Sequence, residues 1–342
     1  MIDARPLVIS VGDPAGIGPE VSIRGAATIE DDAVVIAGDA DRLEALAVVA
    51  GVAKERLVRV SLDDDLRVEP GRLYLAHAGA WSDALLSAGR ASAEGGAAQL
   101  LALDTAVAAV RAGRARALVT GPTSKEAIAS AGTPFVGQTE HLARAAGMVD
   151  DAVTMMFLGP RLRVALVTTH LAVRDAPSAV TPERVARSIT HLGEALVRLG
   201  VRRERPRVLV AGLNPHAGEG GLFGDEEPRA IRPGMEAAAA RPPIASGTVE
   251  LAGLAPAESA FRAAARGDVD GVVAMLHDQA TIASKLLDWG EAVNVTWGLP
   301  FVRTSVDHGV AYDAASAGTA DAKGMIAALR MAQRLTAGER AP

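Results

Sequence analysis

Three of the seven histidines lie at the end of a short apolar run that reads as a β-strand. His170 closes the run VALVTTH, His216 follows VLVAGLNP, and His277 follows VVAML. Ligands bind at the carboxyl edge of open α/β sheets, so three imidazoles at that edge could converge on one divalent cation. The spacing alone is not diagnostic, because a single histidine in such a place is more often a hydrogen-bonded structural residue. His308, in the run VDHG, is a further candidate.

Two glycine-rich turns also follow predicted strands, GDPAGIGPE at residues 12–20 and GPTSK at residues 121–125. Backbone amides in such turns can approach a phosphate or carboxylate, and the second turn opens a helix. Neither has the spacing of a GxGxxG fingerprint or a Walker A loop, so an ATP-hydrolysing function loses support. A plain strand-to-helix turn is an equally good interpretation of each. The candidate residues are Gly12, Asp13, Gly16, Gly121, Thr123, Ser124 and Lys125.

A third group of polar residues follows His277. Lys285 taken singly reads as a solvated surface charge. Asn294 and Arg303 flank the apolar residues 295–302, which we expect to form a strand. An asparagine and an arginine at the two ends of a strand suit the orientation of a hydroxyl group and of a carboxylate or phosphate.

The elements that position these residues alternate between strand and helix, which predicts parallel sheets with helical crossovers. One helix is expected over residues 95–112, closed by Gly113. A second is expected from Thr181, with Pro182 at its first position and Gly200 at its end. His191 falls inside it and is expected at its surface. The predicted strands are Leu7 to Val11, Val34 to Ala37, Ala117 to Thr120, Val164 to Thr168, Val208 to Leu213 and Gly271 to Leu276.

Composition narrows the class of protein. The chain has 342 residues, 49% of them hydrophobic, and a formal net charge of −6 without a basic run, so neither nucleic acid nor an anionic membrane is an expected partner. It has no cysteine, so a metal site must use His, Asp or Glu. Neither a signal peptide nor a membrane span is recognisable, which favours a cytoplasmic protein.

Seven ordered motifs between residues 7 and 321 resemble those of the 4-hydroxythreonine-4-phosphate dehydrogenase family. They are GDPAGIGPE (12–20), TGP (120–122), GQTE (137–140), THL (169–171), LNPHAGEGG (213–221), MLHDQ (275–279) and GLPFVRTSVDHG (298–309). Seven motifs in order are far more specific than any one glycine turn. The resemblance is therefore to the PdxA-like family, with a divergent paralogue as the alternative.

This resemblance implies two α/β/α domains with mostly parallel sheets, of the isocitrate/isopropylmalate dehydrogenase type. We expect residues 1–125 and 295–342 in the first domain, residues 126–294 in the second, and the active-site cleft between them. The family further implies a homodimer with its active sites at the subunit interface. It also implies NAD or NADP as oxidant and one divalent ion per subunit, either zinc, magnesium, manganese or cobalt.

Carried over by position, the resemblance makes His170, His216 and His277 the metal ligands. The implied substrate contacts are Gln138, Thr139, Lys285, Asn294 and Arg303. Lys285, Glu258 and a water molecule remain alternatives for the group that takes the proton of the substrate hydroxyl.

The implied reaction is a metal-dependent, NAD(P)-linked oxidation of the secondary alcohol of a small phosphorylated hydroxy acid. In the family's pathway to pyridoxal phosphate, 4-phosphohydroxy-L-threonine becomes 2-amino-3-oxo-4-phosphooxybutanoate, which loses carbon dioxide. Paralogues act instead on 4-phosphothreonate, on phosphoerythronate or on the cis-dihydrodiol of terephthalate. A non-catalytic protein that binds a phosphorylated metabolite and a phosphate acyltransferase are the alternatives of another class, and three intact histidines argue against both.

Three departures from the family pattern leave the substrate open. Gln138 stands where the vitamin B6 enzymes usually have His, Glu258 where they have Asp, and Ala280 where they have Gly. Glutamine cannot become cationic, so a site that held a phosphate with a protonated histidine would lose a contact of roughly 1.5–3 kcal/mol.

Overall fold

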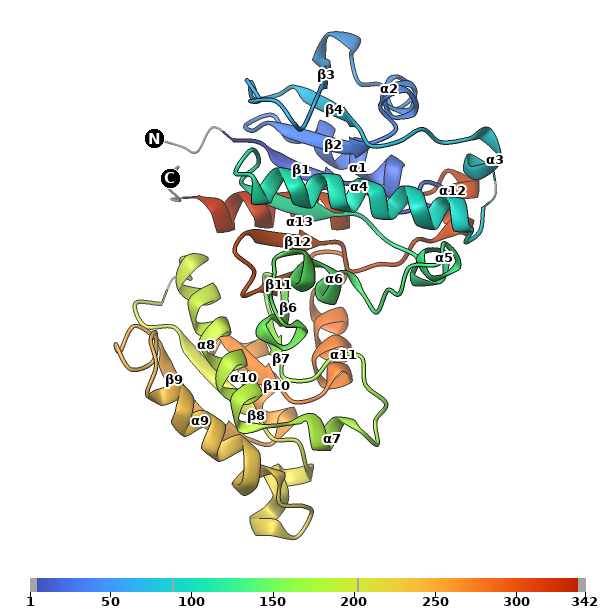
Figure 1. The fold of residues 1–342 in the computed structure, drawn as a ribbon. Coiled ribbons are helices and arrows are strands. Elements are labelled where there is room, and N and C mark those ends of the chain that lie inside the picture. Colours follow the sequence, from blue (N-terminus) through green and yellow to red (C-terminus); the bar gives the residue numbers. More distant parts are fainter. Residues whose placement is uncertain (1–4, 88, 202, 338–342) are drawn as a thin grey trace. The chain divides into compact units, whose positions relative to one another are not determined.

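The computed structural model describes residues 5–87, 89–201 and 203–337, and the chain divides into two compact units (Figure 1). Unit 1 consists of Met1–Asp150 and Leu299–Pro342, and unit 2 of Asp151–Gly298. Residues 126–150, expected in the second domain, belong to unit 1 instead, and residues 295–298, expected in the first domain, belong to unit 2. For residues 126–150 the reason is that α5 (Lys125–Ser130) packs on α4 (Ala93–Arg111), and His141 of α6 (Gln138–Ala145) contacts Asp104 of α4, with Nε2 2.7 Å from Oδ1.

Within its described residues, unit 1 has six parallel strands in the order β3-β4-β2-β1-β5-β12. The strands LVIS, VVIAG and ALVT are buried throughout, as is typical of parallel strands covered on both faces. They confirm the first three predicted strands. The bounds are β1 (Leu7–Ser10), β2 (Val34–Gly38), β3 (Leu57–Val60), β4 (Leu73–His77), β5 (Ala117–Thr120) and β12 (Val302–Ser305).

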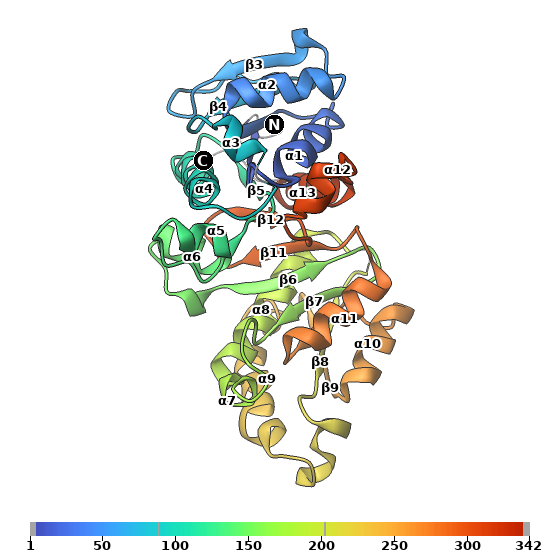
Figure 2. The ribbon, with the colours of Figure 1, turned by 90° about the vertical axis from the view of Figure 1, so that its right-hand side faces the viewer.

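Helices cover both faces of this sheet (Figure 2). On one face α4 packs against β1, β2 and β5. It begins where the Ser92 hydroxyl accepts the Gly95 N–H at 3.1 Å and ends before Gly113, as predicted. On the other face lie α1 (Gly18–Ala27) and α13 (Lys323–Thr336). The remaining helices of unit 1 are α2 (Ala40–Val49), η1 (Lys54–Arg56), α3 (Asp83–Leu86) and α12 (Tyr312–Ala317).

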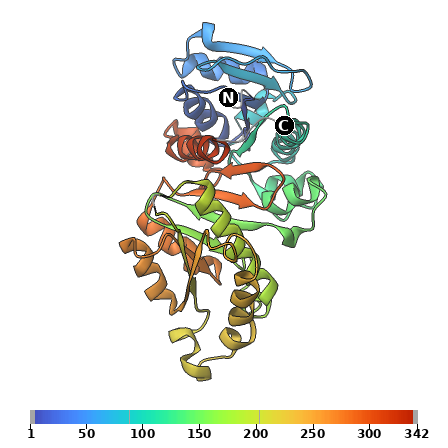
Figure 3. The same cartoon turned by 90° about the vertical axis from the view of Figure 1, so that its left-hand side faces the viewer.

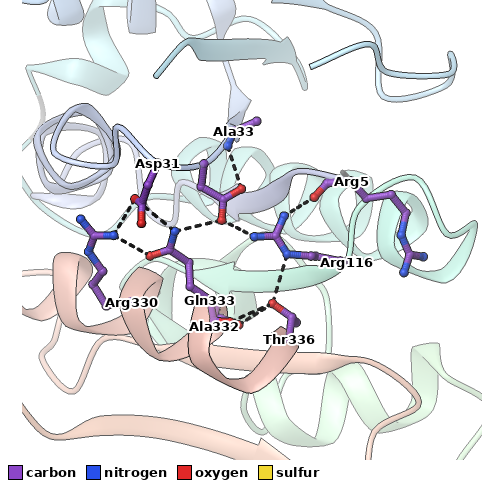
Figure 4. A network of polar contacts seen from close by, with 9 residues as sticks. Arg5, Asp31, Ala33, Arg116, Arg330, Ala332, Gln333 and Thr336 are labelled. Atoms are coloured by element: carbon purple, nitrogen blue, oxygen red, sulfur yellow. Dashed lines mark hydrogen bonds and ion pairs between the residues drawn. The ribbon is translucent and has the colours of Figure 1, made fainter. Parts of the chain in front are cut away.

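A network of polar contacts fastens α13 to the start of β2 and β5 (Figure 4). The buried guanidinium of Arg116 forms an ion pair with Asp32 and donates to Thr336 Oγ1 at 3.1 Å. Gln333 donates to Asp32 Oδ2 at 2.9 Å, and Arg330 donates to Asp31 at 2.7 Å. These side-chain contacts hold the C-terminal helix in unit 1, although Thr336 is more than 200 residues away in sequence from Arg116.

Among the described residues of unit 2, the sheet strands follow the order β11-β6-β7-β10-β8-β9. Strand β6 is antiparallel to its neighbours β11 and β7, whereas β7, β10, β8 and β9 are parallel. The sheet is therefore mostly parallel, as predicted. The bounds are β6 (Thr154–Leu158), β7 (Arg163–Leu166), β8 (Arg207–Ala211), β9 (Glu250–Ala255), β10 (Gly271–Ala274) and β11 (Val293–Trp297).

Helices cover both faces of this sheet (Figure 3). One face carries α8 (Pro182–Arg198) and α9 (Arg232–Ala239), and the other carries α10 (Ala257–Arg266) and α11 (His277–Leu287). The predicted cap of α8 is confirmed, because the Thr181 hydroxyl accepts the Arg184 N–H at 3.4 Å and Pro182 is the first residue. The core between β6, β7, β10 and α10 is mainly aliphatic, with one phenylalanine. Four short segments complete the unit: η2 (Asp150–Ala152), α7 (Ala176–Ala179), η3 (Pro215–Gly221) and η4 (Glu227–Ile231).

Two further expectations were wrong. Residues 295–302 do not form one strand, because Gly298, at φ +98°, and Pro300 break the chain into β11 and β12. Asn294 and Arg303 consequently lie on different strands, in different units. His191 is not a surface residue of its helix. Helix α8 packs on β6, and His191 Nδ1 lies 2.9 Å from Thr154 Oγ1.

None of the helices among the described residues is long and apolar enough to cross a membrane.

Candidate active site

The three candidate histidines follow three neighbouring strands of unit 2. His170 lies four residues after β7, His277 begins α11 directly beyond β10, and His216 lies in η3 beyond β8. Strand β10 pairs in parallel with both β7 and β8, so the carboxyl ends of the three strands lie side by side at one edge. The Thr168 hydroxyl joins two of these ends by donating to the Met275 carbonyl at 2.6 Å.

The structure brings two of these histidines together. The ring centroids of His170 and His277 are 5.4 Å apart, with the planes inclined by 48°. Two imidazoles bound to one tetrahedral ion at ~2.1 Å have centroids roughly 5 Å apart, so this spacing fits shared coordination. His277 Nδ1 lies 2.8 Å from Asp278 Oδ1. A carboxylate at one ring nitrogen orients the other nitrogen toward a metal, which is the usual support of such a ligand.

His216 is placed differently. It starts a left-handed turn in which six successive residues, 216–221, have positive φ, and its ring centroid is 6.3 Å from that of Phe223. Over the described ranges, no three or more His, Cys, Asp or Glu side chains form a group that could hold a metal ion. The spacing of His170 and His277 fits two ligands of one ion, while metal binding there and the part of His216 stay predictions.

Three other predicted residues of unit 2 lie on α10, α11 and β11. Glu258, in the first turn of α10, is fully exposed, and a hydrogen bond from the Ser259 hydroxyl lowers its pKa. A carboxylate with a lowered pKa is a weak general base near neutral pH. The ammonium of Lys285, on α11, lies 5.8 Å from the centre of the Trp289 ring. Asn294 is half-buried on β11.

In unit 1, Arg303 and Gln138 form the centre of a polar cluster. Arg303, on β12, is 2% exposed and donates through Nη2 to Thr120 Oγ1 at 2.7 Å and to Gln138 Oε1. Gln138 Nε2 in turn donates to the Gly121 carbonyl at 3.1 Å and to Thr123 Oγ1 at 3.3 Å. The cluster thus connects β12, the end of β5 and the start of α6.

Burial decides the electrostatics of this cluster. It lowers the pKa of Arg303 to about 9, which leaves the guanidinium cationic at neutral pH. Glu140, one turn into α6, acts in the opposite direction. Thr139 follows Gln138 on the same helix and is half-buried. A buried cation beside polar groups provides a positive potential that an anionic substrate group can use.

The two glycine-rich turns pack against each other. Gly12, at φ +82°, approaches the Pro122 carbonyl so closely that a Cβ there would lie 2.2 Å from its oxygen. Asp13, between them, is buried rather than exposed to a ligand. It accepts hydrogen bonds from the Tyr312 hydroxyl at 2.7 Å, the Ala15 N–H at 3.0 Å and Gln99 Nε2 at 3.2 Å. Asp13 therefore holds the first turn in place.

The second turn has several of its donors engaged within the protein. The Ser124 N–H donates to Gln99 Oε1 at 2.9 Å, and the Ser124 hydroxyl caps α5 by accepting the Ala127 N–H at 3.1 Å. Thr123 bonds Gln138, while Lys125 is exposed. Lys125 is thus the candidate of this turn that can reach an anion in solvent.

A cavity of about 570 Å³ lies in unit 1 beside the first turn. Its walls come from residues 14–20, from α2, from Leu86, Ser87 and Gly89, and from α12. Gly16, a predicted loop residue, lines it, and a Cβ there would lie 2.1 Å from Val310 Cγ1. Arg42 and Glu20 are the charged residues of its lining, with mostly small and aliphatic neighbours.

A family model described as "Pyridoxal phosphate biosynthetic protein PdxA" matches residues 30–332. The chain belongs to the PdxA family. It is 41% identical over 337 residues to a 4-hydroxythreonine-4-phosphate dehydrogenase of Desulfosudis oleivorans, covering 97% of this chain and 96% of the relative. It is 38% identical to a D-threonate 4-phosphate dehydrogenase of Cupriavidus necator, covering 98% of each.

Among solved structures, the 4-hydroxythreonine-4-phosphate dehydrogenase of Klebsiella pneumoniae matches with a TM-score of 0.80 and 32% identity, over 97% of this chain and 99% of that one. All three of these relatives are dehydrogenases, which makes this chain an oxidoreductase.

The motifs of this PdxA family member do not contain every residue that shapes the site. Gln99 and Tyr312 hold the glycine turns, yet neither was a sequence candidate. Gln99 carried a signal, since it is the one polar residue in the Gly95–Leu103 stretch of α4. Tyr312 carried none, because its partner Asp13 is 299 residues away in sequence.

Proposed function

We propose that this protein catalyses the metal-dependent, NAD(P)-linked oxidation of 4-phosphohydroxy-L-threonine to 2-amino-3-oxo-4-phosphooxybutanoate, followed by decarboxylation. The observation that carries the proposal is the His170–His277 pair, 5.4 Å apart at the carboxyl edge of a parallel sheet, in a chain 41% identical to an enzyme of that name. In an α/β sheet this edge is where a ligand is expected.

His170 and His277 would hold the metal, with His216 as the third ligand. When bound, a divalent ion lowers the pKa of an alcohol oxygen and polarises the carbonyl that replaces it. The imidazoles leave the charge of the ion intact because they are neutral. Asp278 keeps the ring of His277 oriented through its contact with Nδ1.

The polar cluster of unit 1 is the proposed contact for an anionic group of the substrate. Arg303 supplies a fixed positive charge and Gln138 orients it. Lys125 is exposed and can approach a phosphate from solvent, as a point charge. Lys285 and Asn294 remain the proposed contacts in unit 2. For the proton acceptor we favour Lys285 or a water molecule over Glu258, whose pKa is lowered.

For the nicotinamide cofactor we propose the 570 Å³ cavity of unit 1. A largely apolar cavity of this volume suits part of a dinucleotide, and it opens beside the glycine turn that includes Gly16. Ala315 and Ser316 of α12 form one wall, and Pro14 to Gly16 form another.

We further propose a homodimer whose interface lies near the histidines. Large apolar side chains are exposed on each histidine-bearing segment, which is unusual for a free surface. They are Leu171, Val173, Leu222, Phe223, Ile282, Leu286 and Trp289. Size-exclusion chromatography tests this, and a fully active monomer would contradict it.

A second candidate substrate is 4-phosphothreonate, because the Cupriavidus necator relative is named for D-threonate 4-phosphate. The two substrates differ at C2, where one carries an amino group and the other a hydroxyl. The deciding experiment records NADH or NADPH formation at 340 nm with 4-phosphohydroxythreonine, 4-phosphothreonate, phosphoerythronate and the terephthalate cis-dihydrodiol. Chelated protein and protein resupplied with zinc, magnesium, manganese or cobalt are compared.

We expect turnover of 4-phosphohydroxythreonine that disappears on chelation and returns with metal. Faster turnover of another substrate would replace the proposed one. Binding of a phosphorylated acid without any NAD(P) reduction would favour a non-catalytic binding protein. Release of phosphate from an acyl phosphate with coenzyme A would favour an acyltransferase.

A further inference from the structure

The three residues that lead from β8 into His216 are held by two side chains from elsewhere in unit 2. Gln279 donates through Nε2 to the Gly212 carbonyl at 3.1 Å. Glu227 accepts the N–H groups of Leu213 at 2.9 Å and Asn214 at 2.8 Å, both through Oε1. Residues 212–214 are thus fixed from two sides, and His216 begins the turn just beyond them.

Gln279 also holds the segment that carries His277. Its Oε1 accepts the N–H groups of Met275 at 3.0 Å and Leu276 at 3.1 Å. A glutamine amide has an acceptor oxygen and a donor nitrogen, so one side chain can serve both loops. Gln279 therefore sets the distance between the base of the His216 turn and the start of α11.

Glu227 is a buried carboxylate, 2% exposed. Burying such a charge is unfavourable unless hydrogen bonds satisfy it. Besides the two backbone groups, Oε2 accepts Asn214 Nδ2 at 2.9 Å. A Cβ at Gly218 would lie 2.9 Å from the same oxygen, so the carboxylate lies directly against the turn that contains His216.

The turn itself needs such support. His216, Ala217 and Glu219 have φ values of 53°, 54° and 41°. Left-handed conformation is unfavourable for residues other than glycine, because Cβ comes too close to the following carbonyl oxygen. A run of this kind persists only where its surroundings hold it.

We propose that Glu227 and Gln279 are positioning residues that set the place of His216 relative to His277. This inference rests on the proposed function in one respect, which is that His216 contributes to metal binding. Glu227 fixes the base of the left-handed turn, and Gln279 couples that base to the β10–α11 turn.

Two conservative variants test this. Glu227→Gln keeps the size of the side chain but turns one acceptor into a donor that faces Asn214 Nδ2. Gln279→Glu keeps the acceptor for Met275 and Leu276 but removes the donor to Gly212. Asp288→Asn is the matched control, because Asp288 is also a 2% exposed carboxylate that accepts a backbone N–H, that of Leu162 at 2.8 Å, at the opposite end of α11.

The measurements are amide hydrogen exchange of residues 212–224 in metal-free protein and the equilibrium affinity for Co²⁺ and Zn²⁺. We expect the amides of this segment to exchange about tenfold faster in both variants. We also expect both variants to bind metal about 10–100-fold more weakly, which is the usual effect of substituting residues that hold metal ligands in place. The control should match wild type in both, and thermal unfolding verifies that each protein is folded.

Unchanged amide exchange in both variants would overturn the inference, regardless of the measured metal affinity. Faster exchange with metal affinity within twofold of a metal-binding wild type would overturn it as well. If wild type binds no divalent ion while exchange responds as expected, the positioning of the turn is supported and the proposed metal site fails.

Discussion

Arg303, the second residue of β12, donates a hydrogen bond through Nη2 to Oε1 of Gln138, the first residue of α6. The carbonyl end of Gln138 is therefore turned toward a buried cation, and its amide nitrogen toward Gly121 and Thr123. Gln138 thus accepts a hydrogen bond from the cationic group of this cluster, Arg303, and does not supply a positive charge of its own.

Because of this relationship, we expect that Gln138→His would not add a charge for a phosphate. A cation within hydrogen-bond distance disfavours a protonated imidazole, so the new side chain should stay neutral. We expect kcat/KM of Gln138→His for 4-phosphohydroxythreonine to be no higher than that of wild type at any pH between 6 and 8.5. Steady-state kinetics across that range decide it. Gln138→Met, which has no group for Arg303, is the comparison and should lose about tenfold. A gain at pH 6 that vanishes by pH 8 would contradict this view.

The Tyr312 hydroxyl joins α12 to the turn at Asp13 by a hydrogen bond, and both segments line the proposed cofactor cavity. Burial raises the pKa of both Asp13 and Tyr312. We expect Tyr312→Phe to reduce the free energy of unfolding by about 1.5–3 kcal/mol and to raise KM for NAD(P) without raising KM for the substrate.

Tyr74→Phe is its matched control, since the Tyr74 hydroxyl accepts the Glu69 N–H at 2.8 Å away from the cavity. Urea unfolding and kinetics of both variants are the measurements. An equal rise of the cofactor KM in the two variants would remove the special role of Tyr312.

His191 lies on the face of α8 that packs on β6. Its burial there, together with the charge of Arg187, lowers its pKa to about 4. The unfolded chain binds this proton near pH 6.5, so the folded state loses stability as pH falls from about 6.5 to 4. The full effect is about 3 kcal/mol. Urea unfolding at pH 7 and pH 5 should show a smaller loss in His191→Gln than in wild type. His77→Gln, at an exposed histidine, controls for the removal of one imidazole. Equal pH slopes in wild type and His191→Gln would refute the assignment.

Arg116 and Arg330 both belong to the network of Figure 4 but differ in burial. Arg116→Leu leaves the largely buried Asp32 without its cation and should cost about 3 kcal/mol of unfolding free energy. Arg330→Leu breaks an exposed pair with Asp31 and should cost less than about 1 kcal/mol. Denaturant titrations measure both. Comparable losses would show that burial does not decide the strength of this network.

The sequence by itself determined the local elements and the residues delivered by them. Short runs such as LVIS and VVIAG read as strands because parallel strands covered on both faces need continuous apolar side chains. Thr181, Pro182 and Gly200 marked the ends of α8 because helix ends have local chemical requirements. The position of His170 and His277 at strand ends followed from the same runs, and their proximity followed once β7 and β10 paired.

Only the tertiary structure decided which polar residues are buried and which conformations the loops adopt. Asp13 reads as a ligand-binding residue of a glycine-rich turn. It is instead a buried carboxylate that accepts a hydrogen bond from Tyr312, 299 residues away in sequence. Arg303 reads as a substrate contact at a strand end, yet it is buried beneath Gln138. The left-handed turn at His216 depends on Glu227, which no local pattern assigns to it. The physical reason is that solvation and hydrogen-bond partners are set by segments distant in the chain, whereas strand and helix preferences are set by neighbours.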